Sequence, residues 1–332
     1  MWQYLLRRAV YMVFTVWVIS LVSFAVVQLP PGDFVTTMLG RLSAAGGNAS
    51  IPQLERELRE QYGLDQPVYV QYVKWLGHVV LDGRFGFSFT YQEDASRIIF
   101  ERLPVTFIIS FLAVLFIWLV ALPIGIYSAV NKYTPGDYLV TFVGFIGLAV
   151  PNFLLALVVM YVSYRYFGKA TFGLFSPEYA SAPWTWARVW DFFQHLWIPV
   201  IIIGSGGAAG LIRTMRANLL DELNRPYVET ARAKGLPERR LLIKYPVRYA
   251  LNPFVSTIGW ILPGLVAGEV IVSQVLNLPT SGPILLNALI NEDMYLAAGF
   301  ILVLSSLTVI GTFISDLLLI WLDPRIRLMK VG

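Results

Sequence analysis

Few side chains in this chain are of the types that bind metals or carry out nucleophilic catalysis. There are no cysteines and only two histidines, His78 and His195, which lie far apart in the sequence. A thiolate metal site and a multi-histidine metal centre are therefore excluded. A hydrolase working within an apolar stretch would need a base beside its nucleophile, and no histidine falls within such a stretch.

A nucleotide-binding loop is also absent from the sequence. The pattern Gly-x4-Gly-Lys-Ser/Thr holds nucleotide phosphates on its backbone N–H groups, and the nearest fragment, Gly168-Lys169-Ala170, lacks the rest of it. The formal net charge of +4 is too small and too scattered to indicate nucleic-acid binding. We therefore expect a chain that is not an enzyme, holds no metal or cofactor of its own and binds no nucleic acid.

Two carboxylates, Glu269 and Asp316, lie within long apolar stretches. A carboxylate at membrane depth is costly and normally faces water or the interior of a helix bundle. Glu269 could serve as a gate in a transport pathway or hold two helices together by a hydrogen bond, and the sequence leaves both interpretations open. For Asp316 a structural pairing is favoured, because Arg325 follows close by.

The elements that must position these groups are membrane helices. Of the 332 residues 57% are hydrophobic and 14% charged, whereas soluble proteins average about 25% charged residues. A helix needs about 20 apolar residues to cross a bilayer. Stretches of this kind predict an all-α integral membrane protein with about six spans, at residues 9–29, 104–130, 138–164, 196–212, 254–276 and 296–322. Glycines in the fourth stretch suit a helix that packs closely against its neighbours.

The distribution of basic residues predicts the orientation of these spans. One set of connecting segments holds 15 lysine and arginine residues in 66 positions, and the opposite set holds 10 in 123. The richer side is cytoplasmic, so both termini and the loop 213–253 should face the cytoplasm of a multi-pass protein. The predicted division is then an N-terminus with the first span (1–29), an external insert (30–102) and a five-helix core (103–332).

Two external segments have a character of their own. Residues 51–58 read as a short amphipathic helix with a proline near its start. The segment 165–195 is rich in tryptophan, including Trp184 and Trp186. Tryptophan at this depth is typical of an interfacial belt, and a substrate-stacking role in the pathway is the alternative.

The cytoplasmic loop 213–253 is more than a connector. Pro226 can start a helix with Glu229 in its first turn, and Gly235 can end that helix before a second start at Leu236-Pro237-Glu238. Two short helices on the membrane face would make a rigid lever for a soluble partner. Adsorption of a basic loop on anionic lipid is the alternative, and the residues alone do not decide between them.

A family resemblance favours the lever. Glu229-Thr-Ala-Arg-Ala-Lys-Gly235 resembles the "EAA" loop of bacterial ATP-binding-cassette (ABC) importer permeases, with Thr230 in place of the first alanine. Further fragments resemble the dipeptide/oligopeptide branch of these permeases, in the same order along almost the whole chain. They include Pro31-Gly-Asp33, Gly63-Leu-Asp-Gln-Pro67, Glu101-Arg-Leu-Pro-Val-Thr106, Val150-Pro-Asn-Phe153, Arg248-Tyr-Ala-Leu-Asn-Pro253 and Leu322-Asp-Pro-Arg-Ile-Arg327.

The resemblance implies a type I importer permease fold in a bacterial or archaeal cytoplasmic membrane. It further implies a second homologous permease, an external solute-binding protein, and two ATPase subunits that bind ATP and Mg. The residues it assigns to coupling with the ATPases are Glu229, Thr230, Ala231, Gly235, Leu236, Arg239 and Arg240.

The sequence does not decide between two kinds of solute or between two sources of energy. The branch resembles importers of peptides and of oligosaccharides, and this chain departs from its pattern after Glu269, on the side where solute arrives. An ion-coupled secondary transporter that uses Glu269 is the rival of a different class, although it would not need the elaborate loop 213–253.

The charge distribution generates a prediction about orientation. In a chain without native cysteine, Ser50→Cys should react with a membrane-impermeant thiol reagent added to intact spheroplasts, and Ala233→Cys should not. The reason is the excess of basic residues that retains segment 213–253 inside. The reverse labelling pattern would overturn the topology.

Overall fold

The structure is a computed structural model that describes residues 2–28, 39–40, 56, 59–60, 66–168, 173–180, 182–252, 254–255 and 270–322. The chain divides into two compact units. Unit 1 consists of Met1–Leu5, Val105–Thr280 and Ile310–Gly332, and unit 2 of Leu6–Pro104 and Ser281–Val309. These units join segments that the predicted division at residues 29 and 102 keeps apart, and that division stays a prediction.

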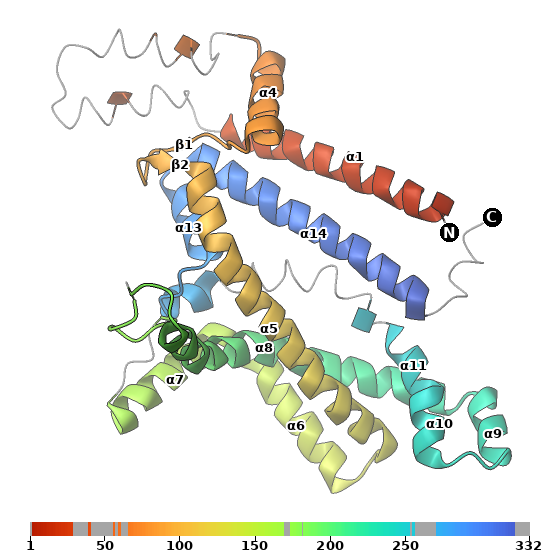
Figure 1. The fold of residues 1–332 in the computed structure, drawn as a ribbon. Helices are drawn as coiled ribbons and strands as arrows, with labels where there is room; N and C mark the ends of the chain where they lie inside the picture. Colours follow the sequence, from red (N-terminus) through yellow and green to blue (C-terminus); the bar gives the residue numbers. More distant parts are fainter. Residues whose placement is uncertain are drawn as a thin grey trace. The chain divides into compact units, whose positions relative to one another are not determined.

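Long apolar helices dominate both units (Figure 1). In the described part of the chain, four helices are long and apolar enough to cross a bilayer, and one bent pair would supply a fifth span. The four are α1 (Trp2–Val27), α5 (Ala95–Val130), α8 (Trp186–Leu223) and α14 (Met294–Leu322). The predicted all-α membrane fold is confirmed. The predicted span 254–276 falls largely outside the described residues, of which 254–255 and 270–275 are helical.

The third predicted span is broken in the structure. It is a pair, α6 (Pro135–Ala149) and α7 (Asn152–Phe167), bent by 97° at the break between them. Pro151 explains the break, since its ring disfavours the helical conformation for the preceding residue. Val150 accordingly has extended backbone, with φ −88° and ψ 117°.

The fourth predicted span lies within a longer helix. We expected residues 196–212, whereas α8 runs without interruption from Trp186 to Leu223. Its start lies in the predicted external loop, where Thr185 Oγ1 accepts a hydrogen bond from the N–H of Arg188. The apolar stretch marks only the part of a helix that suits lipid, and the backbone hydrogen bonds continue beyond it.

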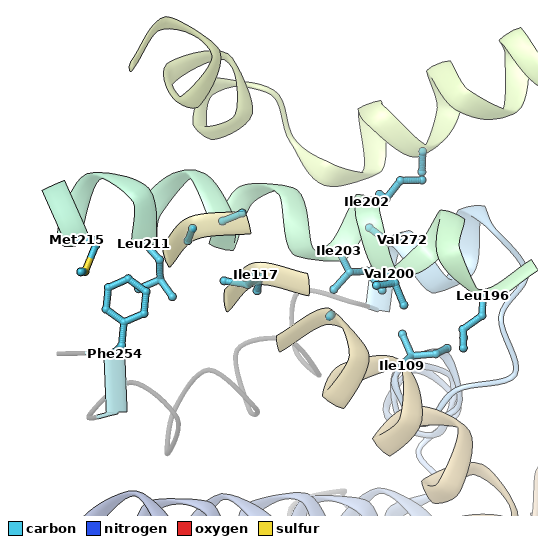
Figure 2. Packing of buried hydrophobic residues seen from close by; sticks show 14 of the residues in the cluster. Ile109, Ile117, Leu196, Val200, Ile202, Ile203, Leu211, Met215, Phe254 and Val272 are labelled. Atoms are coloured by element: carbon cyan, nitrogen blue, oxygen red, sulfur yellow. The ribbon is translucent and has the colours of Figure 1, made fainter. Parts of the chain in front are cut away.

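The core of unit 1 forms where α5 packs against α8. Figure 2 shows Ile109 of α5 beside Leu196 and Val200 of α8, and Ile117 and Ile203 belong to the same buried cluster. The predicted close packing of the glycines is confirmed at two positions of α8. A Cβ atom at Gly204 would lie 2.6 Å from Cδ1 of Phe116, and one at Gly207 would lie 2.7 Å from Cδ1 of Ile117.

Unit 2 contains elements that the sequence did not predict. They are α4 (Val68–Gly77), a π-helical turn (His78–Asp82), the antiparallel hairpin of β1 (Phe87–Ser88) and β2 (Glu93–Asp94), and α13 (Ser281–Ile290). The hairpin is tied to the start of α14, because the buried Asp293 Oδ2 accepts hydrogen bonds from Ser88 Oγ (2.6 Å) and Thr90 N (3.0 Å). The predicted amphipathic helix 51–58 lies almost wholly outside the described residues.

Many large apolar side chains of the described spans are more than half exposed. On α1, Val13 and Phe14 are 65% and 58% exposed, and Phe107 and Leu119 of α5 are similarly exposed. Water would make such faces unstable, so lipid or another membrane subunit must cover them.

The contact between α5 and α8 generates a prediction with a matched control. Gly204→Ala places a methyl group against the Phe116 ring, and overpacking of this kind costs about 1–3 kcal/mol. Gly210→Ala adds the same methyl group on the same helix where no atom lies within 4 Å, so it should be neutral or stabilising. Thermal unfolding of the two purified variants in detergent measures the difference. Equal melting temperatures would contradict the close packing.

Candidate functional site

The candidate site is a pair of short helices that follows the end of α8 (Figure 1). After Leu223 the chain turns into α9 (Pro226–Ala233), then α10 (Glu238–Lys244) and α11 (Pro246–Ala250). Pro226 occupies the first position of α9, where its missing N–H costs no hydrogen bond. Glu229 lies in the first turn, where the helix dipole favours a negative charge. The predicted helix start at Pro226 is confirmed.

Gly235 ends α9 in a Schellman motif. Its φ of +77° is left-handed, a conformation that strains any residue with a Cβ atom. The N–H of Gly235 donates to Arg232 O (2.9 Å), and the N–H of Leu236 donates to Ala231 O (3.4 Å). These are the two hydrogen bonds that define the motif. The predicted turn into Leu236-Pro237 is therefore present, with α10 beginning directly after Pro237.

An ion pair bridges this turn from the outside. Arg232 Nη2 donates to Glu238 Oε1 (2.7 Å), and Nε donates to Oε2 (3.2 Å). The Arg232 guanidinium holds the pKa of Glu238 below its usual value. Both side chains are half exposed, so their contribution to stability is small. The two-point contact instead restricts the angle between α9 and α10.

A small hydrophobic core holds α9 against α10. Val228 and Leu241 are fully buried and Ala231 is nearly so, with Tyr227, Leu236 and Tyr245 packed around them. Tyr227 Oη also donates to the carboxylate of Glu222 near the end of α8. Burial, followed by this hydrogen bond, raises the pKa of Tyr227 above its ordinary value. The two helices thus form one compact body attached to α8.

The structure separates the seven predicted coupling residues into two groups. Ala231 and Leu236 face the small core, buried and half-buried, so they shape the site from inside. The remaining five are exposed in this chain and available to a partner, namely Glu229, Thr230, Gly235, Arg239 and Arg240. Their role in coupling stays a prediction.

A buried ion pair anchors the end of α8, and the sequence analysis did not predict it. Arg216 of α8 donates from Nε to Asp137 Oδ1 (2.9 Å) and from Nη2 to Oδ2 (2.8 Å). Asp137 is 2% exposed and also accepts hydrogen bonds from Ser128 Oγ, at the end of α5, and from Tyr133 N. One carboxylate therefore joins α5, the turn before α6, and α8.

The sequence does contain a local signal for Asp137, namely the start of α6. Thr134-Pro-Gly-Asp137 before an apolar run has the spacing of a capping box, and Thr134 Oγ1 does accept the N–H of Asp137 (3.4 Å). The partner of the Asp137 side chain lies 79 residues further on, which no local pattern indicates.

The residues predicted for a pathway or gate are not brought together in the described part of the chain. Glu269 lies outside the described residues. Trp184 is 69% exposed and packs on Arg188, whose guanidinium carbon lies 4.5 Å from the ring centroid. Trp186 is 89% exposed at the start of α8. Among the described residues, no three His, Asp or Glu side chains gather as metal ligands.

Comparison with known families covers nearly the whole chain. Residues 121–328 match the family "Binding-protein-dependent transport system inner membrane component". Residues 1–110 match the N-terminal family "Binding-prot-dependent transport system membrane comp, N-term".

Individual relatives match over their full length. The oligopeptide transport system permease protein AppB of Bacillus subtilis is 33% identical, with 98% of this chain and 99% of the relative covered. The di/tripeptide transport system permease protein DppB of Pseudomonas aeruginosa is 28% identical, with 98% and 99% covered. A solved structure of the MetNI methionine ABC transporter in an inward-facing conformation has a TM-score of 0.50 at 16% identity. It covers 68% of this chain and 96% of that one, so it shows a similar fold.

The Asp137–Arg216 ion pair predicts that removing either partner lowers stability, but by different amounts. Arg216→Met leaves the Asp137 carboxylate buried without its counter-ion, which should cost about 3–5 kcal/mol of unfolding free energy. Asp137→Asn should cost less, about 1–3 kcal/mol, because Arg216 is 28% exposed and can turn toward water. The measurement is denaturant unfolding in detergent.

Arg213→Met serves as the control, since Arg213 is exposed on the same helix and should change stability by no more than about 0.5 kcal/mol. The double variant should cost less than the sum of the single changes. Strict additivity would show that the two side chains do not stabilise each other.

Proposed function

The chain belongs to the family of binding-protein-dependent transport system inner membrane components, and from this premise we propose that it imports peptides as the permease subunit of an ABC transporter. The match to full-length relatives supports the assignment. The observation that carries the mechanism is the α9–α10 body. It is rigid, capped and exposed, and it is attached to a helix long enough to cross the bilayer.

We propose that the energy for transport comes from ATP hydrolysis by other subunits of the complex. The sequence contains no phosphate-binding loop, so two separate ATPase subunits would bind ATP and Mg. A second, homologous permease and an external solute-binding protein would complete the complex in a bacterial or archaeal cytoplasmic membrane. The excess of basic residues in segments 1–8, 131–137 and 213–253 supports placing both termini in the cytoplasm.

The α9–α10 body would transmit the ATPase movement. When the ATPases close, they would displace the α9–α10 body, which exposes Glu229 on α9, Gly235 in the turn and Arg239 on α10. Because α9 and α10 share a core and an ion pair, they would move as one body and carry the end of α8 with them. Tilting of the spans between two packed arrangements would give alternating access.

A peptide is the solute that the relatives favour. Their names specify oligopeptides and di- or tripeptides. The oligosaccharide alternative and an ion-coupled carrier that uses Glu269 are outcomes of the test. In reconstituted vesicles, peptide uptake should require the ATPases, ATP and the binding protein, and it should persist when ionophores abolish ion gradients. Uptake by this chain alone, driven by an ion gradient, would overturn the proposal.

The same vesicles test the coupling role of Gly235. Gly235→Val should abolish or uncouple uptake while the complex retains ATP hydrolysis, and Glu229→Ala should show a weaker form of the defect. A Cβ atom at Gly235 meets no atom of this chain within 4 Å. The substitution therefore acts through backbone strain of about 1–2 kcal/mol and through the partner.

Gly168→Val separates these two effects. Gly168 is also left-handed, with φ +63° and open space around it, but it ends α7 rather than α9. Gly168→Val introduces the same backbone strain at a position outside the proposed ATPase-contact surface. Peptide uptake by the complex that carries this variant should therefore stay near that of the unsubstituted complex. Equal uptake by Gly235→Val and Gly168→Val complexes, with ATPases bound, would show that the loop is only a connector.

A further inference from the structure

Unit 2 contains a cavity of about 240 Å³ beside α4 that the proposed mechanism does not use. Its lining residues come from the end of α1, from α4, from the hairpin segment and from the start of α14. Figure 1 labels these elements. We call this cavity the α4 cavity and define it by six of its lining residues, Phe24, Lys74, Trp75, Arg84, Asp94 and Tyr295. In the predicted topology α4 and the hairpin belong to the external insert.

The aromatic wall of the α4 cavity is held in place. Phe24, Trp75 and Tyr295 are each less than 10% exposed. The ring centroids of Phe24 and Trp75 lie 5.7 Å apart, and Trp75 Nε1 donates to Phe85 O (3.0 Å). The Tyr295 ring packs directly on the backbone of Gly86, where a Cβ atom would lie 2.6 Å from Cδ1. The cavity thus has a preformed apolar side.

The rim of the same cavity carries two cations. Lys74 and Arg84 are both exposed, and no ion pair between described residues neutralises either of them. The nearby Arg97 provides a contrast, because Glu93 (2.6 Å) and Glu101 (3.2 Å) both neutralise it. Two like charges that line one cavity favour an anion there, and a carboxylate is a good acceptor for both donors.

Asp94 gives the cavity a negative side. Its Oδ1 accepts the N–H of Ser96 at the start of α5 (2.8 Å), and Oδ2 has no hydrogen-bond partner among the described residues. A ligand with an anionic group, an apolar part and a nearby N–H donor would satisfy all three surfaces. The volume lies below the roughly 300–1,000 Å³ of sites that enclose a whole small ligand, so only one end of a longer molecule fits.

We propose that the α4 cavity binds the carboxyl-terminal residue of an incoming peptide. Lys74 and Arg84 bind the terminal carboxylate, the aromatic wall contacts the terminal side chain, and Asp94 accepts the last backbone N–H. The inference rests on the proposed peptide function and adds a first recognition site to it. A lipid phosphate would also meet the two cations, but a phosphatidylglycerol headgroup has no N–H group to donate to Asp94, whereas the peptide backbone has one.

The test compares Ala-Ala-Phe with its carboxyl-terminal amide, using saturation-transfer NMR on the full chain in phosphatidylcholine nanodiscs. The amide should bind at least about tenfold more weakly, since it lacks the charge that the two cations recognise. Lys74→Gln and Arg84→Gln should each weaken binding of the acid several-fold, and Lys74→Arg should retain it. Arg97→Gln removes an exposed charge from the same unit outside the cavity and should change nothing.

The outcomes separate this inference from the proposed function. If the unsubstituted complex takes up no peptide, the proposed function fails. If it does, yet acid and amide bind equally or the cavity variants bind like Arg97→Gln, only the site assignment fails. Equal binding of acid and amide, together with phosphatidylglycerol binding that Lys74→Gln and Arg84→Gln weaken, would identify a lipid site and overturn the inference.

Discussion

The contact between Arg216 and Asp137 fixes the end of α8 against its neighbours in unit 1. Its two hydrogen bonds, of 2.9 and 2.8 Å, hold α8 against the turn that joins α5 to α6. Electrostatic attraction is strong there, because the carboxylate is 2% exposed and water cannot compete with the guanidinium. The helices α9, α10 and α11 follow α8 directly in the chain, so their placement depends on this contact.

Rigid contacts connect the α9–α10 body to α8, and α8 in turn to α5. The α9–α10 body has its own core at Val228 and Leu241, and Tyr227 ties it to Glu222 of α8. Further along α8, Gly204 and Gly207 bring that helix against α5. Close-packed interiors have low compressibility and transmit displacement. A movement imposed on α9 would accordingly shift α8 as a unit.

Surface chemistry differs between the two kinds of exposed region in this chain. On the spans, exposed side chains such as Phe14 and Leu119 are apolar and require lipid or a second membrane subunit. Around α9 and α10 the exposed side chains are mostly charged, as Glu229, Lys234 and Arg239 illustrate. Such a charged surface suits contact with water or with an aqueous protein partner rather than with lipid.

The sequence by itself determined the features that depend on neighbouring residues, namely the membrane helices and the ends of α9. Runs of apolar residues predict membrane helices because every backbone polar group in lipid must be bonded within its own element. Pro226 and Gly235 mark the ends of α9 because one lacks an N–H and the other tolerates left-handed backbone. The family resemblance added the permease assignment, which the comparisons confirm.

Tertiary structure decided everything that depends on contacts between distant residues. Residues 138–164 contain Pro151, but its sequence does not state whether a proline kinks a helix slightly or bends the chain by 97°. The pairing of Asp137 with Arg216, and the gathering of Phe24, Lys74 and Tyr295 around one cavity, join residues far apart in the chain. The energy of such contacts comes from burial and from opposite charges meeting in space, and a linear pattern records neither.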